Sequence, residues 1–471
     1  MIDPAIISAF RDIVGPAGLI DDAVAMKAYM EDIRGYARGR VGLVVMPRST
    51  EEVADVVKLC ARSGLGIIPQ GGNTGLCGGA IADDPGVVAV NLKRMHRIFP
   101  PDSSTCTMIV EAGAVLEAVQ TAAREAGFSF PLSLGSQGSC QIGGNAATNA
   151  GGHSVIRYGS TRALVLGVEV VLADGRVWNG LRVLPKDNTG YDLKDLFLGA
   201  EGTLGIITRL VLRLVPGPHR TETALVAVPD LSAAITLLGT TRAFTAGLVS
   251  AFEYMTARAV ALGAKHVPGV RNPFGSEHEH LVLIEVDRPT ALPDVVMLLE
   301  PILAEAMENG LVADAIIAAS EAQRASLWRI REAIVEGIRG EGGSIAHDIS
   351  LPLGSLEGFL AAANKRVEEV APGVRPVYFG HLGDGNIHYN LCGPAGGDSS
   401  AFKARREEIN MIVFDITHNA GGSFSAEHGI GRLRIGEMAR YKNKVELDLM
   451  RAVKDAFDPH DVMNPGAVLP R

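Results

Sequence analysis

The stretch that decides the fold is LGSQGSCQIGGNAATNAGG at residues 134–152. It is so rich in glycine and small polar residues that it cannot contribute to a hydrophobic core. Glycine lets a backbone make tight turns and approach a ligand closely. We therefore expect this stretch to wrap a large planar ligand and to bind it with backbone hydrogen bonds.

Two other glycine-rich stretches flank it. PQGGNTG at 69–75 follows a predicted strand and offers backbone N–H groups and a hydroxyl to phosphate oxygens. KDNTGYD at 186–192 leads into LGAEGTLGIIT at 198–208. The chain lacks the Gly-Lys dipeptide of a Walker A loop and has no G-x-G-x-x-G after a strand, so P-loop and Rossmann sites are not expected. Taken alone, 69–75 could equally be an ordinary glycine turn.

Composition limits the class of protein. The chain has 471 residues, enough for about three domains or two large ones. Hydrophobic residues make up 47%, which is ample for a core. The net charge of −9 argues against a nucleic-acid partner, which would favour a basic face, and 5% aromatic residues are too few for base-stacking surfaces.

The cysteines and the N-terminal sequence bear on the compartment. The five cysteines form no C-x-x-C pair, and their odd number indicates a reduced compartment rather than a disulfide framework. MIDPAIISAFRDIVG has no basic region typical of a secretory signal. No apolar run reaches 18 residues without a charge, so no transmembrane segment is expected. We expect a cytoplasmic enzyme.

The order of predicted elements favours an α+β fold. Residues 42–69 and 107–135 each read as strand, helix and strand, and Ser49 and Glu52 fit a capping box at the first of these helices. Asp174-Gly175 lies between two β-rich runs, which predicts a hairpin. These elements predict one α+β domain over residues 1–217.

A second α+β pattern begins near residue 218 and extends to 425. Helices are expected over 291–310 and 321–340, and two strands around a Gly-Asp-Gly turn over 374–392. Residues 436–458 read as a helix inside a C-terminal segment, 426–471.

At this point the chain resembles a known family. In order, PQGGNTG, GSCQIGGNAATNAGG, KDNTGYDL and GAEGTLGIIT are similar to the flavin domain of vanillyl-alcohol-oxidase-type FAD enzymes. Among them the chain most resembles the D-2-hydroxyacid dehydrogenases, which include D-lactate and D-2-hydroxyglutarate dehydrogenases and glycolate-oxidase subunits. The resemblance implies a two-subdomain FAD-binding domain, an α+β substrate (cap) domain, and a C-terminal helical segment that returns to the FAD domain.

The resemblance also assigns residues to FAD. The first glycine-rich loop would hold the pyrophosphate, and the later stretches would surround the isoalloxazine and ribityl parts. No His or Cys stands in the loop before Leu76, so FAD should bind non-covalently, and Cys77 is expected to be a small buried residue. The cofactor-binding residues implied are Gln70, Gly71, Gly72, Asn73, Thr74, Gly75, Gly135, Ser136, Ser139, Gly143, Gly144, Asn145, Asn149, Gly151, Gly152, Glu201, Gly205 and Ile207.

GHLGDGNIHYN at 380–390 places two histidines seven residues apart. His381 and His388 would face opposite sides of one straight strand, but the turn at 383–385 permits both side chains to converge. Asn390 lies two residues after His388, on the same face. With Glu427 of SAEHGIG, two histidines and a carboxylate suit a divalent metal with an open position, zinc for preference and manganese as the alternative. An isolated histidine pair would more often be structural.

The resemblance gives these residues roles. It implies that His381, His388 and Glu427 are metal ligands and that His428 is the catalytic base. Asn390 would contact the substrate. Arg331, in a predicted helix, would bind the substrate carboxylate, because a guanidinium matches a carboxylate with two hydrogen bonds. Arg329 is expected on the solvated face of that helix, and Asp384 is expected to be a turn residue.

Two positions depart from the 2-hydroxyglutarate enzymes. Val335 and Ala346 stand where those relatives have a Thr and a Lys. The second carboxylate of 2-hydroxyglutarate would lose its polar partners, so a short monocarboxylate such as D-lactate is favoured. D-2-hydroxyglutarate and D-malate remain alternatives, and for D-malate His347 or Arg329 is the candidate partner of the second carboxylate.

The reaction expected is oxidation of a D-2-hydroxyacid to the 2-oxoacid, with hydride passing to flavin N5. An electron-transfer flavoprotein, a quinone or a cytochrome, rather than NAD, would reoxidise the flavin, and relatives suggest a homodimer. One alternative is the flavin subunit of a glycolate-oxidase-like complex. Another, from a different class, is a metallohydrolase, which would leave the glycine-rich stretches unexplained.

Overall fold

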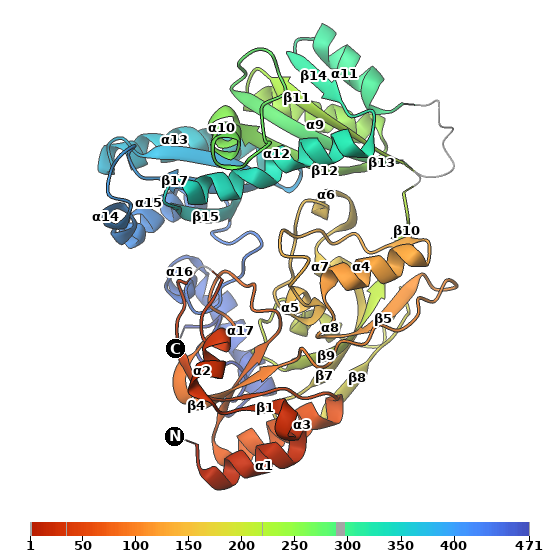
Figure 1. The fold of residues 1–471 in the computed structure, drawn as a ribbon, viewed down its shortest axis with the longest axis vertical. Helices are drawn as coiled ribbons and strands as arrows, with labels where there is room; N and C mark the ends of the chain where they lie inside the picture. Colours follow the sequence, from red (N-terminus) through yellow and green to blue (C-terminus); the bar gives the residue numbers. More distant parts are fainter. Residues whose placement is uncertain (1, 34, 219, 289–296, 471) are drawn as a thin grey trace. The chain divides into compact units, whose positions relative to one another are not determined.

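The computed structural model describes residues 2–33, 35–218, 220–288 and 297–470 (Figure 1). The chain forms two compact units. The first comprises Met1–Gly151, Gly159–Gly217 and Glu427–Arg471, and the second comprises Gly152–Tyr158 and Pro218–Ala426. The units therefore differ from the expected domains mainly in one short segment, 152–158, which belongs to the second unit.

The first unit contains a four-stranded sheet in the order β1-β2-β4-β3. β2 and β3 pair with β4 in parallel, whereas β1 pairs with β2 antiparallel. Leu43 and Val88 on one face, and Val44 and Ala89 on the other, are all buried, as expected for central parallel strands covered on both faces. The elements of this part are α1 (Pro4–Val14), β1 (Leu19–Ile20), α2 (Ala23–Met26), β2 (Arg40–Val45), α3 (Thr50–Ser63), β3 (Gly66–Gln70) and β4 (Asp83–Asn91).

The start of α3 shows how local sequence sets an element. Ser49 Oγ accepts a hydrogen bond from the N–H of Glu52 at 3.2 Å, which satisfies a free donor of the first turn. The Glu52 carboxylate accepts from the N–H of Arg48 at 2.9 Å, not from Ser49 as in a full capping box. The predicted cap is therefore present in part.

A second sheet of the first unit is antiparallel throughout, in the order β5-β9-β7-β8. The predicted hairpin at Asp174-Gly175 joins β7 to β8, with Gly175 at a φ of 81°. The elements are β5 (Thr107–Glu111), α4 (Leu116–Glu125), β6 (Phe128–Ser129), α5 (Ile142–Ala147), α7 (Thr161–Leu164), β7 (Val165–Val171), β8 (Val177–Gly180), α8 (Lys194–Phe197), β9 (Ile206–Arg213) and β10 (Val215–Pro216), with β6 and β10 pairing separately.

The C-terminal segment completes the first unit. The single helix expected over 436–458 is two helices, α16 (Ile435–Tyr441) and α17 (Lys444–Phe457). The chain becomes extended at Lys442, and the Asn443 side chain caps α17 by accepting from the N–H of Val445 at 2.8 Å. Capping residues of this kind compete with helix continuation, which explains the break.

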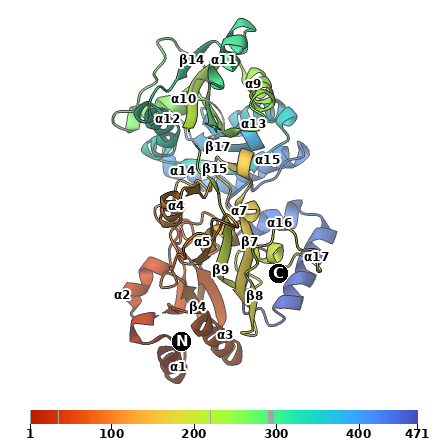
Figure 2. The ribbon, with the colours of Figure 1, turned by 90° about the vertical axis from the view of Figure 1, so that its right-hand side faces the viewer.

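The second unit is built on a seven-stranded antiparallel sheet in the order β14-β11-β13-β12-β16-β17-β15 (Figures 1 and 2). The predicted strands around the Gly-Asp-Gly turn are β16 and β17. The strands are β11 (Arg220–Val228), β12 (Val249–Thr256), β13 (His280–Arg288), β14 (Asp314–Ile317), β15 (Ser344–Ser350), β16 (Arg375–His381) and β17 (Asn386–Cys392).

Helices cover both faces of this sheet. α10 and α12 bury Trp328 and Ile334 against Leu283, Met255 and Phe379 on one face. α13 and α15 contact the other face. The helix predicted over 321–340 is confirmed as α12, whereas the one predicted over 291–310 is observed as α11, and its positions 291–296 lie outside the described residues. The helices are α6 (Val155–Tyr158), α9 (Leu231–Phe244), α10 (Ala257–His266), α11 (Leu299–Glu308), α12 (Glu321–Gly340), α13 (Leu356–Val370), α14 (Ser399–Ala404) and α15 (Arg406–Asn419).

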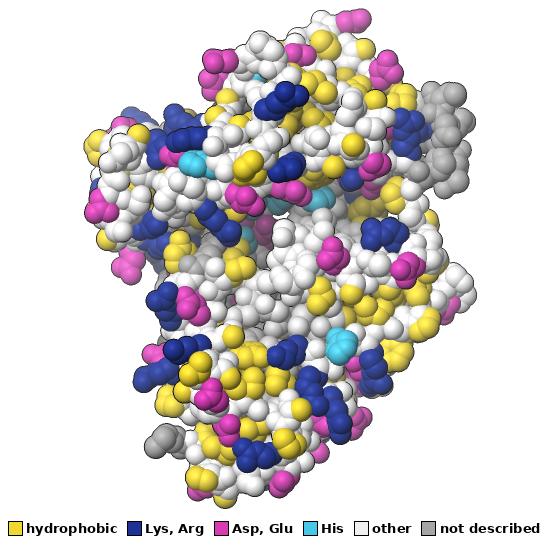
Figure 3. Space-filling view, viewed as in Figure 1, with side chains coloured by type: hydrophobic (Ala, Val, Ile, Leu, Met, Phe, Trp, Pro, Cys, Tyr) yellow, Lys and Arg dark blue, Asp and Glu magenta, His cyan; other side chains and the backbone are white. Residues whose placement is uncertain are grey.

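The surface agrees with the composition. On the face drawn in Figure 3, Lys and Arg side chains are interspersed with Asp and Glu rather than gathered into a basic patch. Within the described ranges, no helix is both long enough and apolar enough to cross a membrane.

Candidate active site

One face of the seven-stranded sheet in the second unit, called the cap unit below, carries the predicted polar residues. In an antiparallel sheet, directly paired residues project to the same face. Phe379 pairs with His388 across β16 and β17, and His381 pairs with Asn386. The rings of His381 and His388 lie 5.2 Å apart between centroids. The prediction that the turn brings both histidines together is therefore confirmed.

Gly385 explains how the turn is made. Its φ is 79°, and a Cβ at this position would lie 2.3 Å from the backbone oxygen of Leu351. Only glycine fits such a position without a shift of the backbone. Asp384 acts as the expected turn residue, since its Oδ1 accepts from the N–H of Asn386 at 3.2 Å.

Asn390 lies on the same face as His388, as predicted. It is 7% exposed, its Nδ2 donates to the backbone oxygen of His388 at 3.1 Å, and its Oδ1 accepts from Ser344 Oγ at 3.3 Å. Ala346 pairs directly with Asn390 from β15 and therefore projects to this face too.

Glu253 on β12 links the two predicted functions of the site, although no sequence motif pointed to it. Its Oε1 lies 2.6 Å from His381 Nδ1, and its Oε2 accepts from Arg331 Nε at 2.7 Å. Burial opposes ionisation, but the charges of His381 and Arg331 outweigh it and hold the pKa of Glu253 well below its usual range. A buried carboxylate on Nδ1 is the arrangement that orients a metal-binding histidine. The available signal was an acidic residue in the apolar strand AFEYM.

Arg331 is held for carboxylate binding. It is 8% exposed, and its guanidinium carbon lies 4.4 Å from the centroid of the Phe379 ring. Nε is used by Glu253, and within the described residues its two Nη groups make no hydrogen bond. The four N–H donors of the two Nη groups are therefore left for an anionic ligand, which a planar guanidinium can bind with two parallel hydrogen bonds.

The two residues suggested as partners for a second substrate carboxylate lie elsewhere. Arg329 is exposed, as expected for the solvated helix face, and donates to the backbone oxygen of Pro268 at 2.8 Å. His347 projects to the opposite face of the sheet from Ala346, where its ring meets Phe414. The suggestion that either reaches the substrate is therefore wrong.

A second polar cluster surrounds His388. His388 Nδ1 lies 3.6 Å from Asp348 Oδ1, and the N–H of Ala426 donates to the backbone oxygen of Asp348 at 3.2 Å. Glu427 and His428 are the next two residues of the chain. Asp348 and His388, with the Glu427 and His428 that follow Ala426, are residues of the types that could together ligate one metal ion.

This set overlaps the predicted ligands without matching them. His388 and Glu427 belong to it, whereas His381 is paired through Nδ1 with Glu253. Asp348 is a further candidate that no sequence motif indicated, because its pairing with His388 depends on the strand order.

In the first unit, the glycine-rich stretches fit a large ligand. A Cβ on Gly72 would lie 2.2 Å from the backbone oxygen of Ser139, so the first and second stretches pack backbone against backbone. Gly135 and Gly144 instead have open space where a Cβ would stand. Gln141 and Asn145 each bury a side-chain oxygen that has no hydrogen-bond partner among the described residues. Such groups are normally bonded, which suits a cofactor lying along this stretch.

Three side chains assigned to FAD are engaged within the protein. Gln70 Nε2 donates to two backbone oxygens, and Asn73 Nδ2 donates to that of Glu31 at 2.8 Å. Glu201 accepts from the N–H groups of Ile430 and Gly431, at 2.7 and 2.9 Å. Cys77 is buried, as expected.

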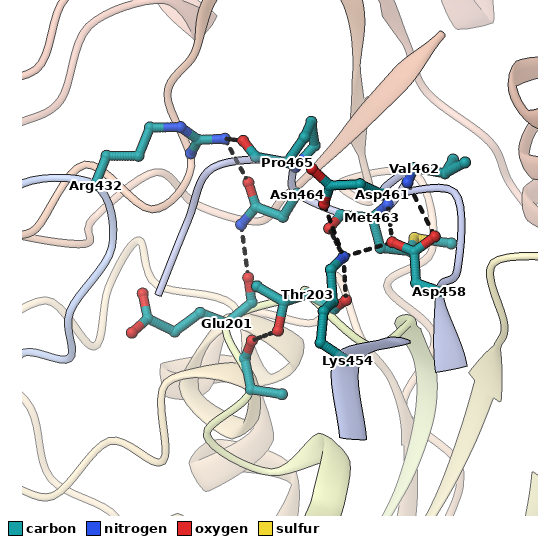
Figure 4. A network of polar contacts seen from close by, with 11 residues as sticks. Glu201, Thr203, Arg432, Lys454, Asp458, Asp461, Val462, Met463, Asn464 and Pro465 are labelled. Atoms are coloured by element: carbon teal, nitrogen blue, oxygen red, sulfur yellow. Dashed lines mark hydrogen bonds and ion pairs between the residues drawn. The ribbon is translucent and has the colours of Figure 1, made fainter. Parts of the chain in front are cut away.

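Glu201 belongs to a network that holds the loop after His428 (Figure 4). Its backbone oxygen accepts from Asn464 Nδ2 at 2.7 Å, and Asn464 Oδ1 accepts from Arg432 Nη2 at 2.8 Å. Burial raises the pKa of Glu201, while the bonds from Ile430 and Gly431 act in the opposite direction. The stretch GAEGTLG thus fixes the backbone that follows His428.

Comparisons with known proteins agree with this geometry. Residues 41–180 match a family described as FAD binding domain, and residues 217–468 match one described as FAD linked oxidases, C-terminal domain. The chain belongs to the FAD-linked oxidase family. The glycine-rich stretches lie in or beside the first matched region, and Arg331, His381 and His388 lie in the second.

This FAD-linked oxidase has curated relatives over nearly its whole length. A probable mitochondrial D-2-hydroxyglutarate dehydrogenase of Oryza sativa subsp. indica is 37% identical over 99% of this chain and 82% of its own. A D-2-hydroxyglutarate dehydrogenase of Xanthomonas citri pv. viticola is 34% identical, covering 99% and 97%. A putative mitochondrial D-lactate dehydrogenase of Schizosaccharomyces pombe is 34% identical, covering 98% and 89%.

Solved structures establish the fold. A p-cresol methylhydroxylase has a TM-score of 0.77 at 18% identity, covering 98% of this chain and 96% of its own. An alkyldihydroxyacetonephosphate synthase has a TM-score of 0.75 at 18% identity, covering 99% and 86%. The predicted α+β architecture of the vanillyl-alcohol-oxidase type is therefore confirmed.

Proposed function

We propose that this FAD-linked oxidase oxidises a D-2-hydroxyacid to the 2-oxoacid. The observation that carries the proposal is Arg331, a buried cation with two Nη groups that make no hydrogen bond within the described residues, beside two histidines on one sheet face. The names of the relatives, D-2-hydroxyglutarate and D-lactate dehydrogenases, support the same substrate class. A metallohydrolase would not account for the match to an FAD-binding family.

In this proposal the chain's residues divide the work. FAD, when bound non-covalently, supplies the acceptor for the hydride from the substrate carbon. Arg331 Nη groups bind the carboxylate, and Asn390 contacts the substrate. His428 takes the proton of the α-hydroxyl as general base. Glu253 keeps Arg331 and His381 in place through hydrogen bonds from both.

We also propose a divalent metal, zinc for preference and manganese as the alternative. His381, His388 and Glu427 would hold it, with Asp348 as a further donor, and this mixed nitrogen and carboxylate set suits either ion. Its chemistry would be to lower the pKa of the substrate hydroxyl and so to assist His428.

The preferred substrate in this proposal is short, with D-lactate as the reference. Ala346 projects to the face of Asn390 and offers no donor, and Val335, four residues after Arg331, is apolar and 42% exposed. A second carboxylate would find no hydrogen-bond donor on either side chain, so it would add no selectivity there. D-2-hydroxyglutarate, which most of the relatives' names favour, is the principal alternative, and D-malate is intermediate.

The electron route and assembly follow from the resemblance alone. We propose reoxidation by an electron-transfer flavoprotein, a quinone or a cytochrome, and assembly as a homodimer. Turnover of the isolated chain with an artificial dye would distinguish this enzyme from a flavin subunit that needs a glycolate-oxidase-like complex.

A dye-reduction screen over D- and L-2-hydroxyacids tests the proposal. The purified protein should show an oxidised-flavin spectrum and reduce the dye with D-hydroxyacids only, D-lactate giving a higher kcat/KM than D-2-hydroxyglutarate. A preference for D-2-hydroxyglutarate would overturn the substrate assignment. Turnover with L-hydroxyacids, or with none, would overturn the activity.

A further inference from the structure

Residues 152–158 belong to the second unit, the cap unit, although the residues on either side of them belong to the first unit, the FAD-binding unit. Arg157 Nη1 donates to the backbone oxygens of Leu248 and Asp287, at 3.1 and 2.9 Å. Ile156 fills the space beside Gly383, where a Cβ would lie 2.4 Å from its Cδ1. These contacts fix the short segment against the turn that follows His381.

His153, in this segment, rests on the helix that carries Arg331. Its ring centroid lies 4.4 Å from that of Trp328, with 38° between the planes. Trp328 is itself held, because its Nε1 donates to Glu285 Oε2 at 2.7 Å. Trp328 precedes Arg331 by three residues on α12, so both lie on one face of the helix. His153 therefore packs against the part of α12 that carries Arg331.

The surroundings keep His153 uncharged and without a protein partner. Burial lowers its pKa to about 4, with Glu253 opposing and the charges of His381 and Arg331 adding to the effect. At neutral pH the imidazole therefore offers one N–H donor. Within the described part of the chain, neither ring nitrogen makes a hydrogen bond. His153 is only partly buried, and neither ring nitrogen is among the enclosed polar atoms of the described residues, so both are accessible to a ligand.

We propose that His153 binds the substrate carboxylate together with Arg331, its ring N–H donating to one carboxylate oxygen. The inference rests on the proposed function. The ring of His153 packs on Trp328, three residues before Arg331 in α12, which favours the carboxylate end of the substrate as its position. A guanidinium binds a carboxylate through two parallel N–H bonds, one from each Nη group, which leaves further lone pairs of the carboxylate for another donor. A neutral donor completes the set without a further buried charge.

Two substitutions of His153 distinguish the effect of its N–H donor from that of its aromatic ring. His153→Phe keeps an aromatic ring against Trp328 and removes the donor, whereas His153→Asn removes the ring and keeps an N–H donor. His280→Phe is the matched control. His280 also stacks on an aromatic ring, that of Tyr254, with centroids 5.9 Å apart, but on the opposite face of the sheet from Glu253.

Two measurements are made on the FAD-loaded protein: steady-state dye reduction with D-lactate, and the Kd of pyruvate from the flavin spectrum. His153→Phe should raise both KM and Kd about 10- to 100-fold, the effect of losing one hydrogen bond to a charged group. Its kcat should change less than about threefold on the same grounds, since the bond is made in ground state and transition state alike. His153→Asn should lie nearer wild type, and His280→Phe should match it.

Three results would overturn the inference. A KM and Kd within twofold of wild type for His153→Phe would exclude contact with the carboxylate. A large fall in kcat with a shifted pH profile and an unchanged Kd would make His153 a proton-transfer residue instead. Absence of pyruvate binding by wild type would remove the carboxylate site altogether. If wild type binds pyruvate but oxidises no hydroxyacid, only the proposed function fails, and the Kd of His153→Phe still tests the inference.

Discussion

The two units of this chain prepare their binding surfaces with different parts of the polypeptide. In the FAD-binding unit the features are backbone: Gly72 lies directly against Ser139, and Gly144 faces open space. In the cap unit they are side chains from separate strands and a helix, held by the buried carboxylate of Glu253. Cofactor binding and substrate chemistry should therefore respond to different substitutions, and each prediction below tests that separation.

Loss of the metal should have the largest effect. A chelator should abolish dye reduction by the wild-type protein and leave the flavin spectrum unchanged, because the proposed ligands come from the cap sheet and the loop at Glu427. His388→Ala should lose metal in elemental analysis and keep its FAD. Full metal occupancy in that variant would remove His388 from the ligand set.

Removal of the base should come next. His428→Ala should lower kcat about 10²- to 10⁴-fold, the usual contribution of a positioned general base. Its FAD content should equal that of wild type, since Glu201 holds the backbone that follows His428. A near-native kcat at neutral pH would exclude the role, and a loss of FAD would contradict the separation.

Two glycine substitutions divide packing from cofactor binding in the first unit. Gly72→Ala puts a methyl group 2.2 Å from Ser139 O and should cost about 1–3 kcal/mol of folding stability, measured by urea unfolding. Gly144→Ala meets no protein atom within 4 Å, so the protein freed of FAD should unfold as wild type does. Its FAD affinity should nevertheless fall. Equal stability of the two variants would show that the backbone contact is not close.

The smallest effect should be a pH-dependent one at Glu341, away from both sites. Lys265, His266 and Arg375 contact its carboxylate and lower its pKa to about 2, from 4.5 for the free side chain. The folded-state pKa is depressed, so the stabilisation is present above pH 4.5 and is lost as pH falls towards 2. Glu341→Gln should lose about 1 kcal/mol at pH 7, since the cluster is partly solvated.

Urea unfolding of both proteins between pH 7 and pH 3 measures this effect. The gap between wild type and Glu341→Gln should narrow as the pH is lowered. A difference in unfolding free energy that stays constant with pH would exclude ionisation of Glu341 as its cause. Dye reduction with D-lactate should be the same in both proteins.

What the sequence could predict follows the same division. Local sequence determines the glycine-rich stretches, the turn at Gly385 and helix α12. The sequence therefore predicts all three. Glu253 acts on His381 and Arg331 because β12 lies beside β16 in the sheet, across 128 residues from His381. No local pattern encodes that strand order.

The remaining differences have the same cause. Asp348 reaches His388 only through the pairing of β15 with β17. The sequence allows His347 to contact the substrate, but the pairing of β15 with β17 places its side chain on the opposite face of the sheet from Ala346. Residues 152–158, which include His153, belong to the cap unit because Arg157 donates hydrogen bonds to backbone oxygens far along the chain. Contacts between residues far apart in the sequence, rather than residue type, explain each of these differences.

Anaerobic reduction of the bound flavin tests the central claim most directly. Wild type and Arg331→Lys are mixed with D-lactate, or with the D-2-hydroxyacid that wild type oxidises fastest, and bleaching of the flavin is followed. We predict full FAD content in both proteins and a second-order rate constant about 30-fold lower in Arg331→Lys, since an ammonium cannot make the paired contact of a guanidinium and the loss of a hydrogen bond to a charged group costs about 1.5–3 kcal/mol. Equal bleaching, or loss of FAD from the variant, would contradict the account.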